Sequence, residues 1–509
     1  MTPRPTLVPV ALRAACQAIG VDASELGQLQ VTGITVDSSD VRPGDVFAAL
    51  PGQHVHGAAF AREAAQRGAV AVVTDAVGAT IVGEALPVVV IESPRAQVGV
   101  LAAEIYRRPA DDLLMLGVTG TNGKTTTTFL LDAGLRAAGH RTGVIGTVAT
   151  LVDGEAFPTV RTTPEASELH ALLAVMRERG VTAVAMEVSS HALAMGRVDG
   201  CTFDVSGFTQ LGSDHLDFHG SDEEYFAAKA TLFTPARSRH AVVTVDDDGG
   251  RRMAATSSTA TQTLGLRPDA DWQVDEVVRT TDGGHRYRLT SPDGLHFGGG
   301  VRLMGRFNVA NAALAQAMLI VAGVDAGRAA AGIERCHGVP GRMERVGDAT
   351  EGIALVVDYA HTADALARAL DAVRPHEGGR VIVVFGCGGD RDAGKRPEMG
   401  RAAAEHADVV VVTDDNPRNE SAELIRRAVL DGTATVDPRR RAEVHEVADR
   451  RTAIGWAVDH AQPGDVVLVA GKGHETGQEI GAVVSPFDDR DEVRRAWQQR
   501  LTAAGGAAT

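Results

Sequence analysis

Residues 113–127 carry a lysine and several threonines directly after a glycine-rich turn. The stretch reads LLMLGVTGTNGKTTT, an apolar run and a turn, and it leads into a segment with apolar residues at helical spacing. Glycines allow backbone N–H groups to approach polyphosphate closely, Lys124 can reach the outer phosphates, and the Thr125 hydroxyl can bind Mg²⁺. The stretch therefore predicts a strand, a phosphate loop and a helix that bind ATP or GTP.

The turn departs from the usual phosphate-loop pattern at one position. A strict G-x-x-x-x-G-K-[ST] needs glycine where Val118 stands, because Gly117 lies one residue too early. A loop that needs glycine only for its backbone angles is the alternative. The string Gly-Thr-Asn-Gly-Lys-Thr resembles the nucleotide loop of the Mur ligases and folylpolyglutamate synthetases, which join a carboxylate to an amine with ATP. This resemblance implies ATP contacts at Gly120, Thr121, Asn122, Gly123, Lys124, Thr125 and Thr126.

Two polar strings follow apolar runs farther along the chain. Glu187 comes directly after residues 181–186, and His215 follows residues 205–211 in a string that offers several metal ligands. A carboxylate after a buried strand is placed to hold Mg²⁺ against a nucleotide. A helix N-cap would explain the serines after Glu187 but not the carboxylate itself. Zinc spacing is absent from the second string, so oxygen-rich magnesium chemistry fits it better.

Lys229 lies in a stretch, residues 225–233, that predicts an amphipathic helix. From pattern alone, a lone lysine on such a helix is a solvated charge. In the Mur ligases, however, the matching lysine is carbamylated by CO₂ and becomes an anion that coordinates Mg²⁺. The resemblance implies that the catalytic residues are Lys124, Glu187, His215 and Lys229, and that the magnesium ligands are Thr125, Glu187, His215 and carbamylated Lys229.

Several hydroxyl side chains have both a local and a functional explanation. Thr162 and Thr163 precede a predicted helix that begins at Ala166, so helix capping would account for them. Ser38 lies in a polar cluster of the kind that usually forms a turn. The family resemblance implies a second role, which is binding of UDP-MurNAc-L-Ala-D-Glu. The residues implied in this role are Ser38, Thr162, Thr163, Ser189 and Arg197.

The last third of the chain repeats one pattern. The apolar runs 353–357, 381–385, 409–412 and 466–470 each end in a polar loop that is often rich in glycine. Ligands of a doubly wound sheet gather at the carboxyl ends of its strands, so these loops predict one site. Two of its arginines suit a carboxylate and two of its acids suit an ammonium, which together describe an amino acid charged at both ends. A structural salt-bridge network is the alternative.

The resemblance makes the ligand of this site more specific. Asp-Asn-Pro-Arg at residues 415–418 is the signature of Mur ligases that add meso-diaminopimelate. It implies that diaminopimelate contacts Arg391, Asp415, Asn416, Pro417, Arg418, Gly471 and Glu475. The same resemblance implies that three further residues lie near ATP, namely Asn308, Arg342 and Asp358.

Length and composition predict the domains that carry these sites. A chain of 509 residues is too long for one core, and the alternation of apolar runs and helical segments predicts an α/β protein of three domains. We expect a small N-terminal α/β domain that binds the UDP substrate at residues 1–110, and a central doubly wound domain with the phosphate loop at 111–342. A C-terminal Rossmann-like domain for the amino acid is expected at 343–509. The net charge of −16, with no long basic run, disfavours nucleic-acid binding.

The remaining sequence features concern the cellular compartment of the protein. The four cysteines are far apart and form no C-x-x-C pair, which argues against a disulfide framework or a zinc site. No signal-peptide layout and no apolar run of membrane-spanning length occurs. We therefore expect a cytoplasmic, monomeric enzyme that binds small molecules.

The activity that this resemblance implies is ATP-dependent addition of meso-diaminopimelate to the D-glutamate of UDP-MurNAc-L-Ala-D-Glu, through an acyl phosphate, in peptidoglycan synthesis. Two alternatives stay open at this point. One is a sibling ligase with another amine or acceptor, which the loop at 415–418 disfavours. The other is a nucleotide-dependent switch that makes no product, which would not need a second charged pocket.

Overall fold

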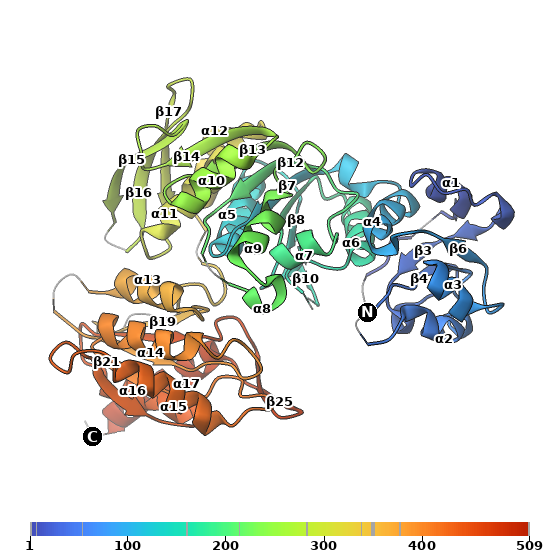
Figure 1. The fold of residues 1–509 in the computed structure, drawn as a ribbon. Coiled ribbons are helices and arrows are strands. Elements are labelled where there is room, and N and C mark those ends of the chain that lie inside the picture. The colour runs from blue at the N-terminus through green and yellow to red at the C-terminus, as the bar shows by residue number, and fades with distance from the viewer. Residues whose placement is uncertain are drawn as a thin grey trace. The chain divides into compact units, whose positions relative to one another are not determined.

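The computed structural model describes residues 3–6, 8–52, 54–158, 161–212, 214–280, 283–336, 338–347, 352–375 and 378–506. The chain divides into two compact units (Figure 1). The first comprises residues 1–276, 287–299 and 310–335, and the second comprises 277–286, 300–309 and 336–509. The predicted domain boundaries at 110 and 342 stay predictions.

The first unit begins with a small parallel sheet. Its strand order is β3-β4-β5-β6, and each neighbouring pair is parallel. The bounds are β3 Gly33–Thr35, β4 Asp45–Ala48, β5 Ala71–Thr74 and β6 Val88–Val90. Before it, β1 Val10–Ala11 and β2 Gln30–Val31 pair antiparallel around α1 Leu12–Gln17. The helices of this part are α2 Ala61–Gln66, α3 Ala76–Val82 and α4 Pro94–Ile105.

One apolar core joins this N-terminal part to a helix much later in the chain. The core contains Leu101 and Ala102 of α4 together with Ala171 and Ala174 of α6, which spans Ala166–Glu178. All of these side chains are at most 1% exposed. Residues 1–110 therefore do not bury their apolar surface alone.

An eleven-stranded sheet follows, with the order β10-β9-β8-β11-β7-β12-β13-β14-β15-β16-β17. Its central strands β8, β11, β7, β12, β13 and β14 are parallel neighbours. The bounds are β7 Leu114–Thr119, β8 Thr142–Ile145, β9 Thr150–Val152, β10 Glu155–Phe157, β11 Ala183–Glu187, β12 Phe203–Phe208, β13 Ser238–Thr244, β14 Ala260–Gly265, β15 Trp272–Arg279, β16 His285–Thr290 and β17 His296–Val301. Its other helices are α5 Lys124–Ala137, α7 Ser190–Ala194, α8 Leu216–His219, α9 Asp222–Ala230, α10 Asp248–Thr256, α11 Phe307–Val321 and α12 Ala326–Glu334.

The predicted order of strand, loop and helix around residue 120 is confirmed by β7 and α5. Gly117 lies inside β7 rather than in the loop, and a Cβ there would come within 2.8 Å of the Phe203 ring. Its glycine is therefore explained by packing against Phe203. Helix α5 buries Leu130, Leu131 and Leu135, which recur at helical spacing.

The second unit contains a six-stranded sheet with the order β18-β19-β23-β20-β21-β22. Strand β18 is antiparallel to β19, and the other pairs are parallel. The bounds are β18 Glu344–Arg345, β19 Ala354–Asp358, β20 Val381–Phe385, β21 Val409–Val412, β22 Glu443–Glu446 and β23 Val466–Ala470, with a separate hairpin β24 Gly477–Ile480 and β25 Val483–Pro486. The helices are α13 Ala363–Val373, α14 Lys395–His406, α15 Ala422–Thr433, α16 Arg450–His460 and α17 Asp489–Gly506.

The four predicted strands of this unit are confirmed as β19, β20, β21 and β23, and they are neighbours in the sheet. Each is a nearly continuous buried apolar run, as expected for a parallel sheet covered on both faces. Because neighbouring parallel strands end at the same edge, the loops that follow them lie together.

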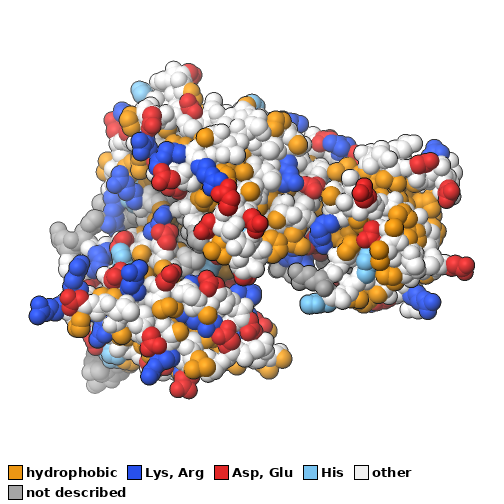
Figure 2. All heavy atoms as spheres, viewed as in Figure 1, with side chains coloured by type: hydrophobic (Ala, Val, Ile, Leu, Met, Phe, Trp, Pro, Cys, Tyr) orange, Lys and Arg blue, Asp and Glu red, His pale blue; other side chains and the backbone are white. Residues whose placement is uncertain are grey.

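Charged side chains of both signs are mixed over the face of the molecule shown in Figure 2, with no field of one sign. Among the described residues, no helix is long and apolar enough to cross a membrane.

A fully buried ion pair fastens the last helix to the second sheet. Arg450 and Asp489 have side chains that are 0% exposed, and Arg450 Nε and NH2 donate to the two carboxylate oxygens over 2.7 Å each. Arg450 NH2 also donates to the carbonyl of Ala470 at the end of β23. Such a pair is costly to break on one side only, because the remaining charge is buried without its counter-ion.

We expect Asp489→Asn to lower the free energy of unfolding of the second unit by about 3–5 kcal/mol, because it leaves Arg450 buried without a counter-ion. Urea unfolding followed by fluorescence measures this, since Trp456 and Trp497 pack in the same core as α16 and α17. The control is Asp431→Asn, which removes the exposed partner of Arg427 and should change stability by no more than about 0.5 kcal/mol. Equal effects of the two variants would contradict the prediction.

Candidate functional site

The phosphate loop between β7 and α5 has no room for side chains at two of its glycines. Gly120 has φ +145°, and a Cβ there would lie 1.9 Å from Thr209 Oγ1. Gly123 has φ +90°, and a Cβ there would lie 2.5 Å from Asn311 Oδ1. The loop is also tied to the next strand end, because Thr209 Oγ1 donates to Asn122 O over 2.6 Å. The turn is therefore a close-fitting, preformed loop at a helix N-terminus, which is the arrangement that binds phosphate.

Two lysines converge on this loop. Lys124 Nζ donates to the carbonyls of Gly120 and Thr121 over 2.9 Å each, and Lys229 Nζ donates to the same Gly120 carbonyl over 3.0 Å. Lys229 is only 1% exposed, so it is not the solvated charge that helical periodicity alone suggests. Burial, reinforced by the charge of Lys124, places the pKa of Lys229 well below its usual value. Burial therefore favours the neutral, nucleophilic form of this amine next to the loop.

Tyr225 joins the lysine to the loop and was not predicted as a site residue. It lies one turn before Lys229 on α9, and the lysine Nζ lies 4.3 Å from the centre of its ring. Its hydroxyl is 3.1 Å from Thr121 Oγ1, which also accepts from Gly212 N. The four-residue spacing between Tyr225 and Lys229 was the only signal in the sequence, and it shows a shared helix face but not the contact with Thr121.

Glu187 ends β11 beside the phosphate loop. Its register partner is Val118 of β7, two residues before Gly120. The side chain is buried, and its carboxylate accepts from Thr147 N over 2.8 Å and from Thr147 Oγ1 over 3.1 Å. Thr147 was not predicted, because it follows β8, and only the parallel pairing of β8 with β11 brings it to Glu187. The carboxylate is thus held in place before any ligand binds.

The predicted substrate residues of the central sheet form one hydrogen-bonded group with Glu187. Thr162 Oγ1 lies 2.9 Å from Thr147 Oγ1, and Thr163 Oγ1 donates to the Glu187 carbonyl over 2.8 Å. Ser189 donates its backbone N–H to Thr163 Oγ1 over 3.1 Å. The structure therefore brings Thr162, Thr163 and Ser189 together at the carboxyl end of β11.

The N-cap of α6 is Glu165, which forms a capping box with Glu168. Thr162 and Thr163 therefore do not cap this helix. Arg197 Nε lies 2.9 Å from Glu165 Oε1, and both side chains are 12% exposed. Ser189 does cap a helix, since its hydroxyl accepts from Ala192 N at the start of α7.

His215 belongs to a group of imidazole and aromatic rings. It adopts φ +57°, and its ring centre lies 4.7 Å from that of His191. Burial lowers the pKa of His215, so the ring is neutral at neutral pH, which is the form that binds metals. Burial, together with His215 and His219, lowers the pKa of His191 to about 4. Across the described part of the chain, no three histidine, cysteine or carboxylate side chains converge in a metal-binding arrangement.

Ser38 lies in the N-terminal part of the first unit, away from the group around Glu187. Its hydroxyl donates to Glu63 Oε2 over 3.4 Å, and the neighbouring Ser39 bonds to Asp37. No hydrogen bond between described residues joins it to Thr162, Thr163 or Arg197.

In the second unit, Asp358 ends β19 and is held by its surroundings. Its two carboxylate oxygens accept from Met343 N over 2.7 Å and from Ala360 N over 2.8 Å. Burial raises the pKa of Asp358, and the charge of Arg342 opposes this shift. The Arg342 guanidinium lies 4.3 Å from the centre of the Tyr359 ring. Asn308 is buried and donates to the carbonyl of Met304 over 2.7 Å, inside the first turn of α11.

The loops after β20, β21 and β23 bring the predicted amino-acid site together. Asn416 Nδ2 donates to Glu475 Oε2 over 2.9 Å, and Asp415 is 7% exposed beside them. Gly471 has φ +108°, and a Cβ there would lie 2.7 Å from Asp415 Oδ2. Gly471 is therefore needed to make room for the Asp415 carboxylate.

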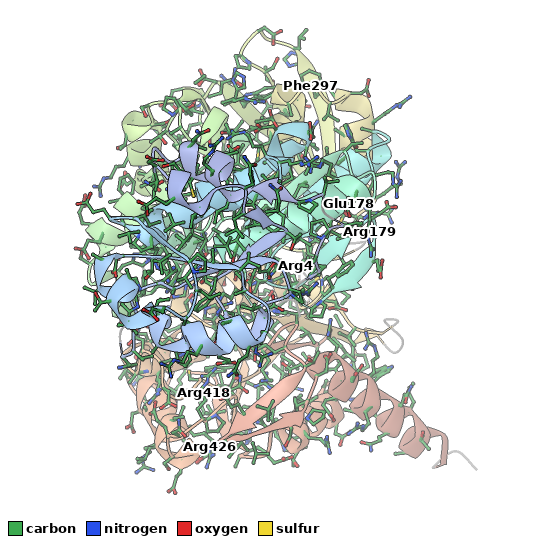
Figure 3. All side chains as sticks on the ribbon, turned by 90° about the vertical axis from the view of Figure 1, so that its right-hand side faces the viewer. Arg4, Glu178, Arg179, Phe297, Arg418 and Arg426 are labelled. Carbon is green, nitrogen blue, oxygen red and sulfur yellow. The ribbon has the colours of Figure 1, made fainter. Side chains whose placement is uncertain are left out.

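Arg418 (Figure 3) connects this site to the β24–β25 hairpin. Its Nε donates to Glu479 Oε2 over 2.9 Å and its NH1 donates to Gly389 O over 2.7 Å. Its backbone, at φ +51°, also bonds to Glu479 and Gly481 of the hairpin. Arg391 is exposed and donates to the carbonyl of Asp390. Pro417 is buried between Asn416 and Arg418.

Lys472 is a buried cation at the centre of this site that sequence reasoning missed. Its side chain is 0% exposed, and its Nζ lies 2.9 Å from Asn416 Oδ1, 3.1 Å from Glu475 Oε2 and 3.6 Å from Asp415 Oδ1. A lysine in a glycine-rich loop gives no sequence signal of burial, because loop lysines are normally exposed. The two acids that were predicted to bind a ligand ammonium thus already face an internal one.

Comparison with known families finds matches over most of the chain. Three family models match, described as "Mur ligase family, catalytic domain" at residues 30–108, "Mur ligase middle domain" at 118–319 and "Mur ligase, glutamate ligase domain" at 341–473. Together they cover more than half of the 509 residues.

Similar proteins of known name point to the same family. A UDP-N-acetylmuramoyl-L-alanyl-D-glutamate--2,6-diaminopimelate ligase of Streptomyces coelicolor is 50% identical over 97% of this chain and 98% of its own. One of the same name from Corynebacterium glutamicum is 46% identical over 95% of both chains. A solved structure of a protein with this name is 33% identical, with a TM-score of 0.68 over 97% of this chain and 100% of its own. The chain therefore belongs to the Mur ligase family.

Proposed function

We propose that the chain joins meso-diaminopimelate to the D-glutamate of UDP-MurNAc-L-Ala-D-Glu with the hydrolysis of ATP to ADP and phosphate. The observation that carries this is a pair of preformed sites at strand ends, one built for phosphate at Gly120–Thr125 and one built of opposite charges at 415–418 and 471–475. Near-full-length relatives at 50% and 46% identity bear the name of this activity. The reaction belongs to peptidoglycan precursor synthesis.

The chemistry proceeds in two steps. The γ-carboxylate of the substrate's D-glutamate attacks the γ-phosphorus of ATP, and the bond to ADP breaks to give an acyl phosphate. The amine of diaminopimelate then attacks the acyl carbon, loses a proton, and phosphate leaves from the tetrahedral intermediate. Lys124 and the loop N–H groups bind the phosphates and offset the charge that moves to ADP.

The residues of the first unit also fit a magnesium site. The Glu187 carboxylate is held by Thr147 beside the loop, and the Thr125 hydroxyl opens α5. Magnesium keeps few protein ligands and takes the rest from phosphate and water, so these groups suit a magnesium–nucleotide complex. His215 and carbamylated Lys229 are the proposed ligands of a second ion. When bound, magnesium would offset the negative charge on the phosphates.

The surroundings of Lys229 support the proposal that it is carbamylated. A neutral, buried amine can add to CO₂ and release one proton, which gives a carbamate anion. The change replaces a potential second cation beside Lys124 with an anion, and so relieves the repulsion that lowers the pKa of Lys229.

The proposed substrate contacts are those that the resemblance to the Mur ligases implies. Thr162, Thr163, Ser189 and Arg197 lie around Glu187 and would contact the peptide part, while Ser38 would contact the UDP part. Asn308, Arg342 and Asp358 would contact ATP. Asp415, Asn416, Pro417, Arg418, Gly471 and Glu475, with Arg391, would contact the distal amino-acid centre of diaminopimelate.

We further propose that the enzyme works as a monomer in the cytoplasm. The two sites are formed by residues of one chain, and both ATP and a UDP-linked precursor are cytoplasmic metabolites.

Phosphate release from ATP in the presence of UDP-MurNAc-L-Ala-D-Glu tests the proposed reaction. We expect release to depend on meso-diaminopimelate rather than on L-lysine, and to fall about 100-fold in Arg418→Ala, since a charge-assisted contact to the distal carboxylate is lost. Release that ignores the amine would favour a nucleotide-dependent switch, and a preference for lysine would favour a sibling ligase.

Arg426→Ala is the matched control for Arg418→Ala. Arg426 (Figure 3) is also a partly buried, ion-paired arginine, and its partners Asp414 and Glu446 lie outside the proposed contacts. Its loss should lower stability but leave the preference for diaminopimelate over lysine unchanged.

A second prediction concerns Lys229. We expect Lys229→Ala to lower kcat by about 10²–10³-fold, because a charge that acts beside the phosphates is lost. Acetate or formate should restore part of the activity by supplying a carboxylate in the vacated space. Wild-type activity should fall in CO₂-depleted buffer and return with bicarbonate.

Lys395→Ala is the control for Lys229→Ala, because Lys395 begins α14 in the other unit and is not buried. The activity of Lys395→Ala should respond to short carboxylates and to CO₂ in the same way as wild-type activity does. An unrescued Lys229→Ala with CO₂-independent wild-type activity would rule out the carbamate.

A further inference from the structure

Lys472 lies among the acidic and amide side chains of the proposed amino-acid site. Its three N–H groups face three acceptors, which are Asn416 Oδ1, Glu475 Oε2 and, more distantly, Asp415 Oδ1. Asn416 Oδ1 also accepts from Glu479 N over 3.0 Å, so the lysine holds this amide with its Nδ2 toward Glu475. The lysine therefore fixes both the geometry and the charge of the site.

The choice of lysine at this position is unusual for this chain. Of the 50 basic residues, only Lys124, Lys229, Lys395 and Lys472 are lysine, and the other 46 are arginine. Two of the four lie at the phosphate loop, and one of those two is buried. A compact ammonium fits among three acceptors where a planar guanidinium does not. Apart from Lys395, the lysines of this chain thus lie at the phosphate loop and at the proposed amino-acid site.

The charges of the residues around Lys472 do not cancel completely. Asp415 and Glu475 carry two negative charges and Lys472 returns one. The buried Arg450 also interacts with both acids, but its own charge is balanced by Asp489, so the cluster keeps one net negative charge. Arg418 is paired with Glu479. Arg391 contributes one positive charge, and within the described residues no carboxylate lies at ion-pair distance from it. One uncompensated charge of each sign matches one amino-acid centre, which has an ammonium and a carboxylate.

We propose that Lys472 is a positioning residue that sets the amine specificity of this site. By cancelling the charge of one of the two carboxylates, Lys472 makes the site suit a distal amino-acid centre that is zwitterionic. Without it, the site would carry an excess negative charge and would suit an amine with a bare distal ammonium. This inference rests on the proposed function, because it concerns how the same site chooses its amine.

The test compares kcat/KM for meso-diaminopimelate with kcat/KM for L-lysine in phosphate release, in wild type and in Lys472→Met. Methionine is close to lysine in length but has no charge. We expect the ratio of the two kcat/KM values to fall by about tenfold or more, mainly through KM for diaminopimelate, while KM for ATP stays within about twofold. A purely structural lysine would lower activity with both amines alike and leave the ratio unchanged.

A second variant separates charge from packing. Asp415→Asn/Lys472→Met removes one charge of each sign and keeps the net charge of the cluster, so the ratio should move back toward the wild-type value. This variant also carries the test if Lys472→Met alone does not fold. Failure of both to fold, or an unchanged ratio in Lys472→Met, would overturn the inference. Wild-type release that ignores the amine would instead overturn the proposed function itself.

Discussion

Parallel strand pairing is the constraint on which both sites depend. Strand β7 lies between β11 and β12, and the register aligns Val118 with Glu187 and Thr119 with Phe208. Because the three strands end together, the loops that follow them are joined by hydrogen bonds. Thr121 N donates to Gln210 O, and Thr209 Oγ1 donates to Asn122 O. The phosphate loop is therefore shaped by its neighbours as well as by its own glycines. The second sheet repeats this arrangement with β20, β21 and β23.

Much of this arrangement could be predicted from the sequence because buried parallel strands are continuous apolar runs, and the polar residue after such a run lies at the ligand edge. Glu187 was found in this way, and so were the loops that contain Asp358 and Asp415, although the roles of these two residues came from the family resemblance. Thr147, Tyr225 and Lys472 were not, since their roles come from pairing, packing and burial that one sequence does not display. Local patterns also misled: Lys229 reads as solvated but is buried, and the threonines before α6 read as caps although Glu165 is the cap.

The polar groups of both sites are already partnered within the protein. Glu187 is held by Thr147, Arg197 by Glu165, Arg418 by Glu479 and Glu475 by Lys472. Held groups need little reorganisation when charge develops, which favours catalysis and selectivity. The same pairing means that a ligand must share or replace existing hydrogen bonds and ion pairs. A ligand with the wrong charge leaves buried groups without a partner, and the site therefore binds it weakly.

The apolar core that α4 shares with α6 limits how this chain can be divided. Leu101 and Ala102 pack with Ala171 and Ala174, although the two helices are separated by the whole phosphate-loop segment. A fragment cut after residue 110 would expose apolar surface on both products, and such surfaces promote aggregation. Recombination with a relative at that boundary would have to exchange the facing side of α6 as well. Residues 1–110 and helix α6 thus form one folding neighbourhood, which has to be kept or replaced as a whole.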